Sequence, residues 1–77
     1  MSFFTPPELI EAELFATVPA HLRKKGHPSS WIDANHPGSG IDCFLEGPAF
    51  DREGNLYCVD IPYGRIFRLS PRGTWDV

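Results

Sequence analysis

The side chains best able to do chemistry in this chain are carboxylates in its C-terminal half. Glu46 precedes a Gly-Pro pair, Asp51 opens a turn-like tetrad, and Asp60 lies inside an apolar run. A carboxylate oxygen suits a hard cation, but a calcium site needs about 6–8 oxygen ligands. We expect Asp60 to hydrogen-bond to a neighbouring loop, and Asp51 and Asn55 to serve the turn. Taken alone, Glu46 is expected to be an ordinary carboxylate at the start of a strand.

The histidines and cysteines do not have the spacing of a metal or catalytic centre. His21, His27 and His36 are separated by 6 and 9 residues, whereas zinc ligands are usually closer together and paired with cysteine. We therefore expect histidines that lie on the surface or pack in a loop. Cys43 and Cys58 form no C-x-x-C pair and are expected to be free thiols. No catalytic triad and no glycine-rich phosphate loop can be argued, so catalytic residues are unknown.

The composition excludes several classes of function. The 77 residues include 8 Pro and 7 Gly and carry a net charge of -3. This Pro and Gly content is too high for a helical bundle, and a strongly basic surface that would bind nucleic acid is not expected. No apolar run approaches the roughly 20 residues that span a bilayer, and residues 1–7 do not resemble a secretory signal. We expect no nucleic-acid or membrane partner, and a cytoplasmic location in which thiols stay reduced.

Residues 45–77 have the spacing of a small antiparallel sheet. Gly54, Gly64 and Gly73 lie 10 and 9 residues apart, and each closes a turn-like tetrad. Glycine suits this last position because positive φ costs it no steric clash. Strand-length runs lie beside the turns, at residues 47–50, 55–61, 65–69 and 74–77. The pattern predicts a four-stranded antiparallel meander, with no helix between residues 55 and 69.

The predicted strand over residues 56–61 is largely apolar on both faces. Both faces therefore need a neighbouring layer, as the sheet of a β-propeller blade does. A single four-stranded sheet cannot bury two faces by itself. We therefore expect the isolated chain to be marginally stable or to self-associate. For Trp31 and Trp75, packing in the core or between blades is favoured over stacking on a substrate.

Residues 1–44 form a separate N-terminal part. Thr5-Pro6-Pro7-Glu8 is typical of a helix start, whereas alternating apolar residues between Ile10 and Ala16 favour a half-buried strand. Pro19 ends either element, and the residues alone leave both open. The segment 20–44 has no periodicity and is predicted to be a long irregular loop.

Three motifs in the C-terminal part together resemble the opening of the SMP-30/gluconolactonase/LRE family. They are Glu46-Gly47-Pro48 with the acidic turn after it, Leu56-Tyr57-Cys58-Val59-Asp60 after Gly54-Asn55, and Gly64-Arg65-Ile66. The resemblance covers residues 44–77. It implies an all-β fold, namely the first blade of a six-bladed β-propeller, truncated after this blade. Residues of about 8–18 are then expected to form an outer strand that closes the ring.

The resemblance also implies a function. Members of this family are calcium- or zinc-dependent lactonases whose first metal ligand is the Glu of Glu-Gly-Pro, here Glu46. The chain is therefore interpreted as the N-terminal part of a metal-dependent lactonase/gluconolactonase-like hydrolase. Such an enzyme opens a lactone ring with a metal-polarised carbonyl and an activated water. The divalent cation (Ca²⁺ or Zn²⁺) and the lactone are expected only in the full-length context, and the 77-residue chain alone is expected to be inactive. The alternative is a non-catalytic single-blade fragment or an interaction module.

Overall fold

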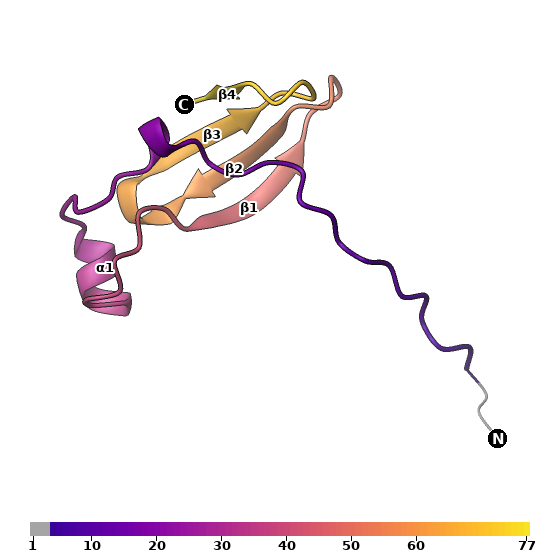
Figure 1. Cartoon of the computed structure of the whole chain (residues 1–77), viewed down its shortest axis with the longest axis horizontal. Helices are drawn as coiled ribbons and strands as arrows, with labels where there is room; N and C mark the ends of the chain where they lie inside the picture. The colour runs from indigo at the N-terminus through magenta and orange to yellow at the C-terminus, as the bar shows by residue number, and fades with distance from the viewer. Residues whose placement is uncertain (1–3) are drawn as a thin grey trace.

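The computed structural model describes residues 4–77, and four strands form its main element. In chain order the elements are η1 (Ala20–Leu22), α1 (Ser30–Asn35), β1 (Leu45–Phe50), β2 (Leu56–Asp60), η2 (Ile61–Tyr63), β3 (Arg65–Leu69) and β4 (Trp75–Asp76). The strands make one sheet in the order β1-β2-β3-β4, and each pairs antiparallel with the next (Figure 1). The predicted all-β class and the four-stranded antiparallel meander are confirmed.

The three turns of the meander lie where the glycine spacing predicted them. Gly54, Gly64 and Gly73 have φ values of 84°, 61° and 90°. Each of their N–H groups donates to the carbonyl three residues earlier, at 3.2, 3.3 and 2.9 Å. The middle turn is one turn of 3-10 helix, η2, although no helix was expected between residues 55 and 69. The reason is that a single 3-10 turn and a β-turn share the same hydrogen bond from residue i+3 to residue i.

One face of the sheet carries the core. Cys58, Phe67 and Leu69 are buried on this face, and Val18 packs against the first two. Val18 belongs to residues 18–24, which we call the covering segment. This segment lies along the sheet in Figure 1. Trp75 borders the cluster and meets Phe67 edge-on, with ring centroids 5.7 Å apart.

The opposite face, which we call the open face, has no covering layer among residues 4–77. Tyr57 and Val59 of β2 lie on it together with Ile66 and Arg68 of β3, because side chains alternate between the two faces of a strand. Val59 is 39% exposed and Ile66 is 61% exposed. The described residues therefore cover one of the two apolar faces that the sequence predicted.

The strand predicted over residues 8–18 is wrong for this chain. Residues 5–19 contain no helix or strand, and the N-terminal tail of residues 4–17 runs away from the sheet in Figure 1. A β-strand forms only when its backbone N–H and C=O groups are hydrogen-bonded to a neighbouring strand. None of β1 to β4 pairs with the tail. Large apolar side chains of the tail are consequently 71–94% exposed, namely Leu9, Ile10, Leu14 and Phe15.

The segment 20–44 is mostly irregular, as predicted, but it contains η1 and α1. The Ser29 hydroxyl caps α1, because its oxygen accepts the N–H of Ile32 at 3.3 Å. The same hydroxyl donates to the Pro62 carbonyl at 2.7 Å, which ties α1 to η2. The Tyr63 hydroxyl also lies 3.1 Å from two carbonyl oxygens of the loop. Within residues 4–77, no helix is long and apolar enough to cross a membrane.

Candidate functional site

Glu46 lies on the edge strand β1 at a β-bulge. The register pairs Glu46 with Val59 and Ala49 with Tyr57, so β1 has one extra residue between these pairs. Gly47 has a φ of 63° at this point, a left-handed conformation that glycine adopts at little steric cost. Bulges at sheet edges turn a side chain in a new direction, and they are frequent beside active sites. The Glu-Gly-Pro motif therefore has a local structural role in addition to any ligand role.

The Glu46 side chain is exposed and stands on the open face. Its cross-strand neighbour is Val59, which in turn pairs with Ile66. In residues 4–77, no group of three or more His, Cys, Asp or Glu side chains is placed to hold a metal ion. A single carboxylate falls short of both the four ligands usual for zinc and the six to eight for calcium. The described residues by themselves therefore do not fit a metal ion, and the assignment of Glu46 as a ligand stays a prediction.

Within residues 4–77, the histidines belong to no group of three or more side chains that could hold a metal ion. His36 instead packs with Trp31 and Phe44. Its ring centroid lies 5.4 Å from that of Trp31 and 6.0 Å from that of Phe44. This arrangement agrees with the loop-packing role expected for the histidines. Trp75 packs against Phe67 at the edge of the core, as predicted. Trp31 packs against Phe44 and His36 outside the core cluster.

Both cysteines are free thiols, in agreement with the prediction. Cys58 is buried, and Cys43 is partly buried beside Arg23. Burial raises the pKa of both thiols above the usual value of 9.0, and at Cys43 the Arg23 charge offsets only part of that rise. Because the thiolate is the nucleophile, these thiols are poorly suited to covalent catalysis at neutral pH.

Asp51 organises the turn between β1 and β2. Its Oδ1 accepts the backbone N–H groups of Glu53 and Asn55, both at 2.9 Å. Its Oδ2 accepts the Asn55 side-chain amide at 2.9 Å and the Tyr57 hydroxyl at 3.1 Å. These hydrogen bonds, that of the Asn55 side chain foremost, hold the pKa of Asp51 below its usual value of 3.8. The turn role predicted for Asp51 and Asn55 is confirmed.

Asp60 is fully buried and connects β2 to the loop at Phe44 and to Arg65 of β3. Its Oδ1 accepts the N–H of Phe44 at 2.8 Å, which confirms the predicted hydrogen bond to a neighbouring loop. Its Oδ2 accepts two hydrogen bonds from the Arg65 guanidinium. Arg65 also donates to the Leu22 carbonyl at 2.6 Å. The sequence reasoning missed Arg65 as the partner, although the two residues pair directly across β2 and β3.

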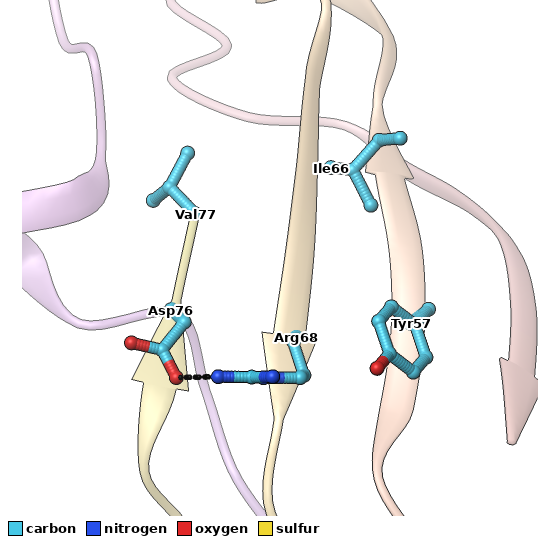
Figure 2. A pocket seen from close by; sticks show the side chains of 5 residues that line it. All are labelled: Tyr57, Ile66, Arg68, Asp76 and Val77. Carbon is cyan, nitrogen blue, oxygen red and sulfur yellow. Dashed lines mark hydrogen bonds and ion pairs between the residues drawn. The ribbon is translucent and has the colours of Figure 1, made fainter. Parts of the chain in front are cut away.

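A shallow hollow of about 310 Å³ lies on the open face (Figure 2). It is lined by Tyr57, Ile66, Arg68, Asp76 and Val77. Arg68 and Asp76 form an ion pair at 2.7 Å, and the Tyr57 hydroxyl is already bound to Asp51. Because the two charged groups of the lining pair with each other and the Tyr57 hydroxyl binds Asp51, we expect the hollow to suit apolar packing better than the orientation of a polar substrate.

No protein-family model, curated protein or solved structure matches the chain. The resemblance to the SMP-30/gluconolactonase/LRE family therefore depends on the motifs of residues 44–77 alone.

Proposed function

We propose that this chain acts as one blade of a larger β-propeller, in which the open face packs against a neighbouring sheet. The observation that carries the proposal is the difference between the two faces. The face with Phe67 is covered by the chain itself, whereas Val59 and Ile66 on the opposite face remain exposed to water. Covering apolar surface stabilises a protein by about 25 cal/mol per Å². A second sheet on the open face would therefore be favourable.

The shape of the open face supports sheet-on-sheet packing. Facing sheets interdigitate their side chains, so each needs hollows that receive side chains of the other. The hollow beside Ile66 offers such a place, and the two charged residues in its lining, Arg68 and Asp76, already form an ion pair with each other. When a sheet covers the face, Arg68 and Asp76 would be buried as a pair, whereas Glu46 would need a partner from outside residues 4–77.

Within such an assembly, the chain would belong to a metal-dependent lactonase-like hydrolase. Support comes from the Glu46-Gly47-Pro48 motif at a bulge of an edge strand, and from the family resemblance. Glu46 would contribute one carboxylate to a Ca²⁺ or Zn²⁺ site. The remaining ligands and the general base would come from residues outside 4–77. No step of the reaction is assigned to the described residues.

The test compares Glu46→Gln with Glu53→Gln in the assembled protein. Glu53 is an exposed glutamate of the β1–β2 turn whose side chain is not part of the bulge. We expect Glu46→Gln to weaken metal binding and lactone hydrolysis together, while Glu53→Gln leaves both unchanged. Unchanged metal affinity and activity in Glu46→Gln would refute the ligand assignment. Calorimetric titration of the 77-residue chain alone should show no tight site for Ca²⁺ or Zn²⁺.

The second candidate function is a non-catalytic interaction module, and the exposed apolar tail favours it. Four large side chains between Leu9 and Phe15 are in contact with water, in addition to the open face. A module of this kind would add its sheet to another propeller without contributing to catalysis. The two functions differ in one result. If assembly depends on the open face but Glu46→Gln changes neither metal binding nor hydrolysis, the chain is an interaction module.

A further inference from the structure

We draw no further inference here: the strongest candidate, the exposed apolar tail of residues 4–17 with its acidic Glu8, Glu11 and Glu13, carries none because nothing in the structure shows what covers it, and the sheet edges beside Glu46 and Asp76 offer it no charge complementarity.

Discussion

The Arg65 guanidinium holds the Asp60 carboxylate inside the fold through two hydrogen bonds to the same oxygen. Nε and Nη2 of Arg65 lie 2.9 and 2.7 Å from Oδ2 of Asp60. The guanidinium also lies 4.7 Å from the centroid of the Phe67 ring and binds the Leu22 carbonyl. Since Leu22 belongs to the covering segment, this ion pair connects that segment to the sheet.

Removing the Arg65 charge should unfold the sheet, whereas removing the Arg68 charge should not. In Arg65→Met the Asp60 carboxylate would stay buried without its partner, which costs about 3–5 kcal/mol. That is as much as the roughly 3–5 kcal/mol of total stability expected for a core of this size. Arg68 and Asp76 form an exposed pair, with side chains 49% and 54% accessible. Such a pair contributes about 0–1 kcal/mol, so Arg68→Met is the matched control.

Urea denaturation followed by circular dichroism would measure both variants. A loss of stability in Arg65→Met no larger than that in Arg68→Met would show that the buried pair does not hold the covering segment in place.

The bulge at Glu46 should depend on the backbone conformation of Gly47. Apart from residues 46–48 themselves, no heavy atom lies within 4 Å of the position that a Cβ on Gly47 would occupy, so an added methyl group meets no clash there. The cost of Gly47→Ala should therefore come from the φ of 63° alone, and we expect a loss of about 1–2 kcal/mol. Gly47→Asn should lose less, since asparagine enters the left-handed region more readily. Equal stability of the wild type and Gly47→Ala in denaturant titrations would argue against a bulge fixed by this residue.

The Asp51 carboxylate should contribute stability that disappears in acid. Its pKa is lowered in the folded chain, above all by the hydrogen bond from the Asn55 side chain. A lowered pKa means that the contribution is present above the unfolded pKa, near 3.8, and is lost as pH falls through the folded pKa. Asp51→Asn should remove this part of the pH dependence.

An NMR titration of the Asp51 carboxyl group would test the direction of the shift. The midpoint should lie below 3.8 in the folded chain and return to an ordinary value in concentrated urea. A folded-state midpoint at or above the urea value would contradict the hydrogen-bonding role of Asp51 in the turn.

The two thiols should react slowly while the chain is folded. Burial raises the pKa of Cys43 and Cys58, and Cys58 is only 7% exposed. Because alkylation requires an accessible thiolate, we expect iodoacetamide to modify both cysteines at least about tenfold faster in urea than in buffer. Mass spectrometry of peptides would separate the two sites. Rapid modification of Cys58 in buffer would mean that the covered face opens readily.

Local signals in the sequence were sufficient to predict the sheet. Gly54, Gly64 and Gly73 are turn residues, and the strand-length runs between them contain β2 and β3, of five residues each. The turn role of Asp51 could be predicted for the same reason, since its partners lie within six residues. The six-residue helix α1 was missed because it is too short to show a helical period.

Features that depend on distant residues were harder to predict. The apolar alternation of residues 8–18 is that of a strand, but a strand needs a partner, and none of the four described strands pairs with it. The bond from Arg65 to Leu22 spans 43 residues and leaves no local pattern. At the candidate site, the Glu46-Gly47-Pro48 motif was enough to indicate Glu46 from the sequence. The β-bulge at this position is visible only in the strand register of the structure. Further ligands are not found among residues 4–77.

We propose that the open face needs a neighbouring sheet. The association state of the 77-residue chain is the most direct test of this proposal. We would measure it by size-exclusion chromatography with light scattering. We predict a mass above the 8.6 kDa of one chain, and a return toward that mass in Ile66→Lys, which adds a charge to the open face. Phe50→Lys, at an exposed position outside the hollow, is the control and should still associate. A wild-type chain that is monomeric and melts cooperatively would contradict the proposal, because its open face would then be stable in water without a neighbour.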